Sequence, residues 1–194
     1  IHYYNLELLK KDAEYDNNFL KLYKKFSPGP LTYILKKKKK SKVSKFANAK
    51  LKTIAVRFPK NKIIRSLLKK LTFPLAIPSA NISTGVSPTE PSDVVDEFKN
   101  KIKFILNGGK SLIGLESTVI NLSSKPAILR PGSISHTQIE KVLRKKVSNV
   151  TKSKFVISPG MHKRHYSPGI PIKLNSIKPD YKAAFIVFGK KYKM

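Results

Sequence analysis

The sequence predicts an α/β fold, a twisted mixed sheet with flanking helices. Apolar residues recur at helical spacing over residues 5–26 and 60–71. Runs rich in β-branched and aromatic residues occupy residues 31–35 and 51–58, and turns with proline or glycine separate many of these segments. The chain has 194 residues, of which 40% are hydrophobic, so it is long enough to bury one substantial core.

The first half of the chain alternates helices and strands. Residues 5–26 predict one or two amphipathic helices, which end at SPGPLT because its two prolines and glycine exclude a helix. The strands at 31–35 and 51–58 flank a lysine-rich loop, and residues 60–71 form a short helix. Residues 73–81, FPLAIPSAN, are expected to form a buried strand that leads into a polar loop.

The second half begins with a helix over residues 87–102, whose hydroxyl residues, prolines and early acidic residues mark a helix N-terminus. Three short strands are expected next, at 103–109, 117–123 and 126–132. A last helix covers residues 135–147, with Ser135 or Thr137 as its N-cap.

Near residue 149 the character of the chain changes. Residues 1–148 are predicted to form one domain. Residues 149–181 contain four prolines and no hydrophobic period, which is typical of a long linker or covering loop. Residues 182–194 are expected to begin the first strand of a further, truncated domain.

Composition excludes several classes of protein. There is no cysteine, so disulfides, thiolate metal sites and cysteine nucleophiles are excluded. No apolar run approaches the roughly 20 residues that cross a bilayer, and no signal peptide is visible, so a cytoplasmic protein without a membrane partner is expected. The net charge of +29 is typical of nucleic-acid binding, but only five of the 40 basic residues are arginine. Lysines spread through every segment favour a solvated surface instead.

Two of these five arginines directly follow apolar runs. Arg57, in IAVRFP, and Arg130, in AILRPG, both precede a proline at the C-terminal end of a predicted strand. Ligands of open α/β sheets bind at such ends, so the two guanidinium groups predict a paired anion site. A surface ion pair is the alternative for either arginine.

Three other segments gather polar groups. Residues 78–89, PSANISTGVSPT, offer hydroxyl and backbone N–H groups to an anion, although a simple capping turn also explains them. Glu116 follows in GLESTVINL, whose polar residues can line a pocket or lie in solvent, and Glu116 can also act as a general base. The histidines of residues 161–166, MHKRHY, have no carboxylate close by in the sequence, so no metal ligand is predicted.

Six motifs occur in one order along the chain: SPGPLT, TIAVRFP, PSANISTGVSPT, GLESTVINL, ILRPGSIS and SPGMHKRHYSP. Together they resemble the YrdC-like family, specifically its long, two-domain threonylcarbamoyl-AMP synthases. The last motif separates the long form from the single-domain form, and in that family a Rossmann-like domain follows it. The family's phosphate-gripping Lys-x-Arg-Pro motif is not found here, so the resemblance identifies a fragment that is truncated at both ends.

The resemblance implies a nucleotidyltransferase, an L-threonylcarbamoyladenylate synthase. Such an enzyme condenses L-threonine, bicarbonate and ATP, with Mg²⁺, into threonylcarbamoyl-AMP and pyrophosphate, and a threonylcarbamoyl transferase complex uses the product to modify tRNA. The family's threonine-binding positions fall on His2, Arg57 and Ser117. Its ATP-binding positions fall on Thr53, Ser79, Asn81, Ser87, Arg130, His165 and Tyr166. No side chain is expected to act as a nucleophile or a metal ligand, because the protein positions its substrates and stabilises their charges.

Two alternatives remain open at this point. One is a YrdC-like protein that binds double-stranded RNA or tRNA through a basic cavity and does not adenylate. The other is the YrdC-like domain of carbamoyl-transferring hydrogenase maturation factors, against which the SPGMHKRHYSP motif argues.

Overall fold

The computed structural model describes residues 1–83, 85–149, 171–176, 178, 180 and 182–186. It confirms the predicted α/β class. The helices are α1 (Leu6–Leu9), α2 (Asn17–Phe26), α3 (Lys62–Lys69), α4 (Pro91–Phe98) and α5 (His136–Leu143), with a 3₁₀ turn η1 (Lys99–Lys101). The strands are β1 (Ala13–Glu14), β2 (Leu31–Lys37), β3 (Thr53–Arg57), β4 (Thr118–Asn121), β5 (Ala127–Arg130) and β6 (Ser148–Asn149).

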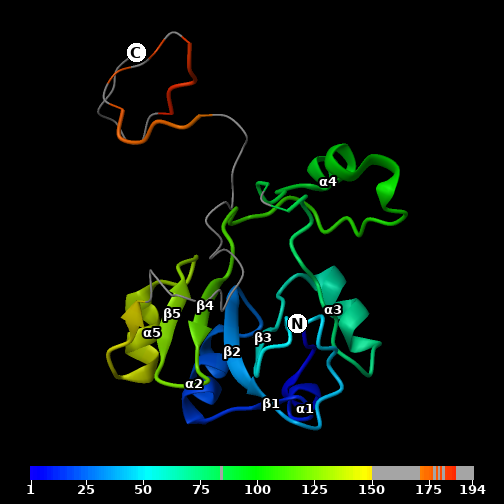
Figure 1. The fold of residues 1–194 in the computed structure, drawn as a ribbon, viewed down its shortest axis with the longest axis vertical. Helices are drawn as coiled ribbons and strands as arrows, with labels where there is room; N and C mark the ends of the chain where they lie inside the picture. Colours follow the sequence, from blue (N-terminus) through cyan, green and yellow to red (C-terminus); the bar gives the residue numbers. More distant parts are fainter. Residues whose placement is uncertain (84, 150–170, 177, 179, 181, 187–194) are drawn as a thin grey trace.

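The six strands form one mixed sheet around β2 (Figure 1). Strand β2 runs antiparallel to β3 and parallel to β4, while β5 is antiparallel to β4. Strand β1 pairs with the last residues of β2, and β6 extends the sheet beyond β5. The register places Arg57 opposite Thr32, Leu31 opposite Thr118, and Arg130 opposite Val119. The C-terminal ends of β3 and β5 therefore lie at the same edge as the N-terminal ends of β2 and β4.

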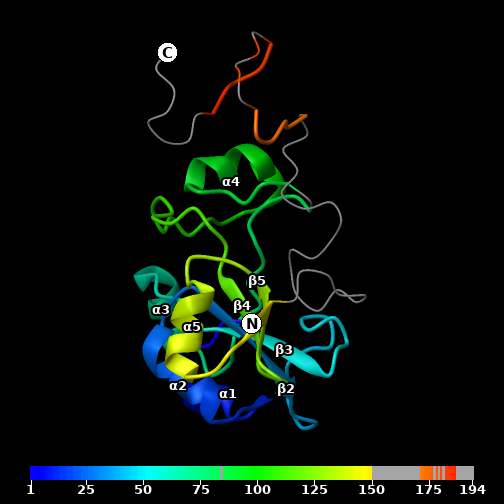
Figure 2. The same cartoon turned by 90° about the vertical axis from the view of Figure 1, so that its left-hand side faces the viewer.

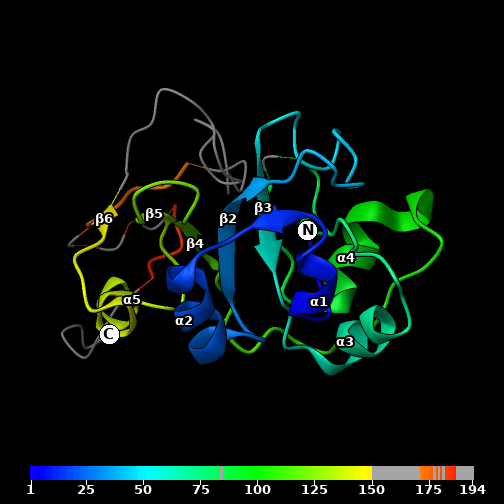
Figure 3. The same cartoon turned by 90° about the horizontal axis from the view of Figure 1, so that it is seen from below.

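Helices α2 and α5 pack side by side on one face of the sheet (Figure 3). The sheet turns alternate side chains toward them, and Tyr33, Ile120 and Ile128 join the main core with Phe19 of α2 and Ile139 of α5. The opposite face carries a smaller apolar cluster: Ile34, Val119 and Leu129, with Ala55 packed against it. Both faces thus follow the alternation expected of strands.

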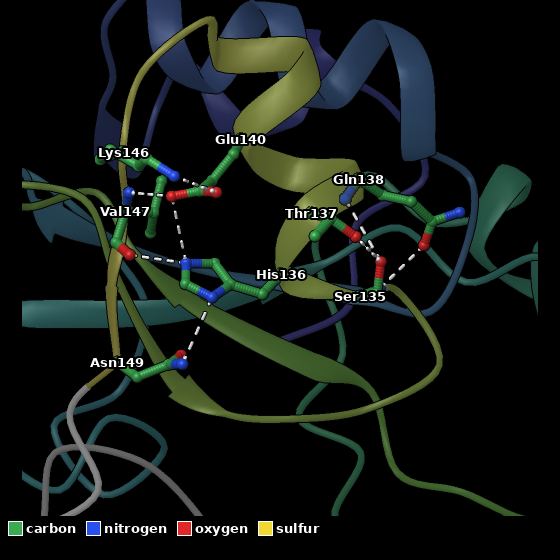
Figure 4. A network of polar contacts seen from close by, with 8 residues as sticks. All are labelled: Ser135, His136, Thr137, Gln138, Glu140, Lys146, Val147 and Asn149. Atoms are coloured by element: carbon green, nitrogen blue, oxygen red, sulfur yellow. Dashed lines mark hydrogen bonds and ion pairs between the residues drawn. The ribbon is translucent and has the colours of Figure 1, made fainter.

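The N-terminus of α5 confirms Ser135 as the cap (Figure 4). The Ser135 hydroxyl oxygen accepts a hydrogen bond from the backbone N–H of Gln138 at 3.2 Å, and the Ser135 N–H donates to the Gln138 side chain at 2.8 Å. This reciprocal pair is a capping box. Thr137, the other predicted cap, contributes a hydrogen bond to the Ser135 hydroxyl at 2.9 Å.

The same helix holds the segment that leads into β6 (Figure 4). His136 Nε2 lies 2.6 Å from the carbonyl oxygen of Val147, and the Val147 N–H donates to Glu140 Oε1 at 2.8 Å. The Asn149 side-chain nitrogen lies 3.3 Å from His136 Nδ1. Two residues of α5 therefore fix both backbone groups of Val147.

Helix α4 lies away from the sheet (Figures 1 and 2). It starts at Pro91, four residues after the start of the predicted helix, with a capping box between Glu90 and Asp93. None of its residues is buried, and Val95 is 50% exposed. Its placement therefore depends on the loops at its two ends rather than on a packed apolar face.

Two predicted strands are wrong. Residues 73–81 make only an isolated bridge, between Leu75 and His2, because prolines at 74 and 78 offer no N–H group to a ladder. Residues 103–109 form no strand either, and Phe104 is 90% exposed. Among the described residues no neighbouring strand pairs with this apolar run, so its backbone has no ladder to join.

The predicted strand of the further domain is described only over residues 182–186. These residues form no strand, and Ile186 is 91% exposed. The rest of that segment and most of the predicted linker lie outside the described residues. In the part of the chain that the structure describes, none of the helices has the length and apolarity to cross a membrane.

Candidate functional site

A pocket of about 670 Å³ lies at the edge of the sheet where β3 and β5 end. Residues 86–89, 111, 114 and 115 form its other side, and Glu116 lies where the two sides meet. Its polar lining residues are Arg57, Ser87, Thr89, Ser111, Glu116 and Arg130. Three of the predicted ligand-binding residues, Arg57, Ser87 and Arg130, therefore meet in one pocket although they lie far apart in the sequence.

Arg57 reaches the pocket from the last position of β3. Its backbone N–H donates to the carbonyl oxygen of Ile1 at 2.9 Å, and its Nε donates to that of Gly29 at 3.2 Å. A Cβ on Gly29 would clash with the carbonyl oxygen of Phe26, so this turn requires glycine. Burial lowers the pKa of Arg57; Glu116 opposes this effect and Arg130 adds to it. Two arginines close enough to influence each other are suited to an anionic ligand.

Arg130 is held against the backbone of the neighbouring strand. Its Nε donates to the carbonyl oxygen of Ser117 at 3.1 Å, and its Nη2 donates to the Ser117 hydroxyl at 3.0 Å. The Ser117 hydroxyl also lies 2.7 Å from the hydroxyl of Thr32. Ser117 is 3% exposed and lies next to the pocket, between Arg130 and Thr32. Its threonine-binding role stays a prediction.

Glu116 connects the two sides of the pocket. Its Oε1 accepts a hydrogen bond from the Ser87 hydroxyl at 2.7 Å, and its Oε2 lies 3.6 Å from Arg130 Nη2. The Glu116 side chain is 31% exposed and that of Arg130 is 14% exposed. The structure shows Glu116 lining a pocket rather than lying in solvent, and its role as a general base stays a prediction.

Segment 86–89 is itself tied to α4. The carboxylate of Asp93 accepts hydrogen bonds from the backbone N–H of Thr89 at 2.8 Å and of Glu90 at 3.1 Å. These backbone bonds are the main cause that lowers the pKa of Asp93. The N-terminus of α4 is therefore linked by hydrogen bonds to the Ser87 side of the pocket.

His2 lies behind Arg57. It bridges to both Arg57 and Leu75, and its N–H donates to the Leu75 carbonyl oxygen at 2.7 Å. Burial lowers its pKa to about 3, and the positive charge of Arg57 adds to this effect. Its Nδ1 is buried and has no hydrogen-bond partner among the described residues. The imidazole is therefore neutral and retains an unused polar atom beside Arg57.

Other predicted residues lie outside this pocket. Thr53 and Arg57 lie on the same face of β3 but at its opposite ends. Thr53 is therefore about 13 Å from Arg57 along the strand. Ser79 is exposed in the loop before the pocket. The Asn81 amide closes its own turn by donating to Ile82 and Gly85, at 2.7 and 3.2 Å. Their ATP-binding roles stay predictions, as do those of residues 165 and 166, which lie outside the described residues.

Two residues that shape the site were missed by sequence reasoning. Thr32 ends the SPGPLT motif and holds the Ser117 hydroxyl, so this motif was a usable signal. Gly132 packs so closely on the next strand that a Cβ would clash with the backbone of Glu116, Ser117 and Thr118. The ILRPGSIS motif marks a Pro-Gly turn here, but the close approach that requires the glycine depends on tertiary structure.

The site contains charged and hydroxyl groups arranged for binding. Among the described residues no three His, Cys, Asp or Glu side chains gather as a metal site. Two guanidinium groups and one carboxylate face a common space, and this arrangement favours positioning of charged substrates over attack by a side chain.

Comparison with known proteins identifies the family. The family described as "Telomere recombination", which is that of Sua5, YciO and YrdC, matches residues 1–132. The C-terminal domain of threonylcarbamoyl-AMP synthase matches residues 134–191. This second match supports the long form over a hydrogenase maturation factor.

Several relatives carry the name threonylcarbamoyl-AMP synthase. The Pyrococcus abyssi protein is 39% identical over 86% of this chain and 49% of its own length. The Schizosaccharomyces pombe protein is 40% identical over 80% of this chain and 41% of its own. This chain thus spans about half the length of the curated relatives that it matches.

The P. abyssi protein has also been solved in complex with L-threonine. That structure matches with a TM-score of 0.79 and 39% identity, over 86% of this chain and 50% of the other. Its agreement with the sheet and helices described above confirms the predicted fold class and the resemblance found in the six motifs. The chain belongs to the Sua5, YciO and YrdC family.

Proposed function

We propose that this chain forms the substrate-binding part of an L-threonylcarbamoyladenylate synthase. The observation that carries the proposal is the pairing of Arg57 and Arg130 at one sheet edge, in a chain whose relatives bear that name. The enzyme would condense L-threonine, bicarbonate and ATP into threonylcarbamoyl-AMP and pyrophosphate. Its product would serve a threonylcarbamoyl transferase complex that modifies tRNA in the cytoplasm.

The reaction needs no protein nucleophile. The threonine amine adds to the carbon of CO₂ derived from bicarbonate and releases a proton, which gives a carbamate. A carbamate oxygen then attacks the α-phosphorus of ATP, and pyrophosphate leaves. Arg57 would pair with the threonine carboxylate, while Arg130 would stabilise negative charge on the phosphates.

The nucleotide would enter as its Mg²⁺ complex. Mg²⁺ commonly keeps several waters and binds substrate phosphates with few protein carboxylates, so it would be held mainly by the ATP phosphates. Ser87 lines the pocket and is proposed to contact the nucleotide. His165 and Tyr166, in the SPGMHKRHYSP motif, are proposed to close over it.

The test is release of pyrophosphate from ATP by the complete protein. We expect release only when threonine and bicarbonate are both present. Arg57→Lys keeps the charge but loses the guanidinium fork, and we expect it to raise the KM for threonine about tenfold. Arg144→Lys, at the exposed end of α5, is the matched control and should leave KM unchanged. ATP turnover that is indifferent to threonine would rule the function out.

RNA binding is a second proposal, carried by the net charge of +29. Contacts to phosphates release counterions, so affinity for double-stranded RNA or tRNA should fall steeply as salt is raised. Weak binding that does not depend on salt would exclude a specific role for RNA. This measurement is independent of the pyrophosphate assay, so either function can fail alone.

A further inference from the structure

One carboxylate lies among the positive charges of the pocket. Glu116 is the single acidic side chain among the described residues that line it, and it lies with Arg57 and Arg130. Its two oxygens face different partners, the Ser87 hydroxyl at 2.7 Å and Arg130 Nη2 at 3.6 Å. The 3.6 Å separation is longer than a good charge-assisted hydrogen bond, so Arg130 does not saturate Oε2.

The pocket offers charges of both signs, which suit the two charged ends of a zwitterion. Arg57 and Arg130 carry two positive charges and Glu116 carries one negative charge, which leaves an excess of one positive charge. An α-amino acid carries its carboxylate and its ammonium group a few bonds apart. A ligand of this kind can place its carboxylate on Arg57 only if its ammonium finds an acceptor nearby, because an unpaired buried charge is costly. Glu116 is the carboxylate in the pocket that can accept it.

We propose that Glu116 binds the α-ammonium group of the amino-acid substrate and thereby makes the pocket specific for amino acids over hydroxy acids. The proposal rests on the proposed function, since it assigns a partner to the amine of threonine. Ser87 acts as a positioning residue for this contact. Its hydroxyl donates to Oε1 and fixes the carboxylate, while Oε2 remains directed toward Arg130.

A divalent cation is a less suitable partner for the same carboxylate. Mg²⁺ beside Glu116 would raise the charge of the three-residue group from one positive charge to three. The ammonium of a zwitterion brings its own carboxylate and leaves the total unchanged. Mg²⁺ is therefore placed with the ATP phosphates, and its binding to Glu116 is an outcome that the experiment must be able to reveal.

The experiment compares two ligands that differ in one group. L-Threonine and 3-hydroxybutanoate share the carboxylate and the hydroxyl, but only threonine has the amine. Their affinities are measured by isothermal titration in the complete protein without nucleotide and without Mg²⁺. The variants are Glu116→Gln, which keeps an acceptor for Ser87 but removes the charge, and Glu140→Gln, a charge-matched control on α5.

We expect wild-type protein to bind threonine more tightly than 3-hydroxybutanoate. Glu116→Gln should weaken threonine about tenfold to a hundredfold, the cost of one charge-assisted hydrogen bond, and leave 3-hydroxybutanoate unweakened. Glu140→Gln should change neither affinity. Retained thermal stability of Glu116→Gln, read in the same samples, would show that the loss is not one of folding.

Other outcomes overturn the proposal. An equal loss for both ligands would make Glu116 a residue that only positions the arginines. ATP is titrated separately into the same variants, with and without Mg²⁺. Unchanged threonine affinity, together with loss of the Mg²⁺ effect in that second titration, would assign Glu116 to the metal. If wild-type protein binds no threonine at all, the proposed function itself fails, and this result differs from a failure confined to Glu116.

Discussion

The two sides of the pocket are built differently. On the sheet side, Arg57 and Arg130 end strands whose backbones are paired, and Ser117 directly precedes such a strand. On the loop side, segment 86–89 precedes a helix with no buried residue, and its hydrogen bond to the sheet side runs from Ser87 to Glu116. The sheet side is therefore expected to be rigid, whereas the loop side can adjust to a ligand.

Gly132→Ala is the largest expected disturbance of the sheet side. The new Cβ would meet the backbone of residues 116–118, and that backbone can move only by disturbing β4. Overpacking of this kind costs about 1–3 kcal/mol of unfolding free energy, and it should also displace Glu116 and Ser117. Denaturant unfolding and threonine titration measure the two effects.

Ser133→Ala is the matched control for this variant, since Ser133 is exposed in the same turn. It should be neutral in both measurements. Wild-type stability and affinity in Gly132→Ala would mean that the sheet side is not the rigid wall described above.

This contrast also separates what the sequence could predict from what it could not. Runs rich in β-branched and aromatic residues predicted β2 and β3, and short apolar runs between turns predicted β4 and β5. The position of Arg57 and Arg130 after apolar runs predicted their meeting. The strand-forming run and the arginine that follows it are neighbours in the sequence, so both can be recognised without knowledge of the fold.

Features that depend on distant contacts were not predicted. Strands β1 and β6 have two residues each, too few for a pattern. Apolar residues 103–109 have the composition of a strand but find no partner among the described residues. The bond from Ser87 to Glu116 joins residues 29 apart, and only the fold brings them together.

An intermediate effect is expected from His2, which lies behind the sheet side. Burial above all lowers its pKa to about 3, against 6.5 for the free side chain. As pH falls below 6.5 the unfolded chain takes up a proton on His2, but the folded chain does not. The stability that neutral His2 contributes is complete above pH 6.5 and declines by up to about 1.4 kcal/mol per pH unit between 6.5 and 3.

Carboxylates also change the unfolding free energy at low pH, so replacement of His2 is needed to isolate the pH-dependent contribution of this residue. The unfolding free energy of His2→Gln should fall less steeply between pH 6.5 and 4 than that of wild type. Parallel profiles for the two proteins would place a protonated imidazole in the folded state, contrary to the neutral His2 inferred above.

The smallest effect on stability is expected from Ser87→Ala, which cuts the tie between the two sides. Ser87 lies on the loop side, and Glu116 would keep its proximity to Arg130, so the unfolding free energy should change by less than about 0.5 kcal/mol. Ligand binding should nevertheless weaken, because the freed Glu116 carboxylate can turn toward Arg130 and compete with a bound anion. Threonine and ATP titrations measure this loss, and Ser92→Ala, at an exposed position of α4, is the control. A drop in stability with unchanged affinities would show that the loop side is a structural support rather than an adjustable wall of the pocket.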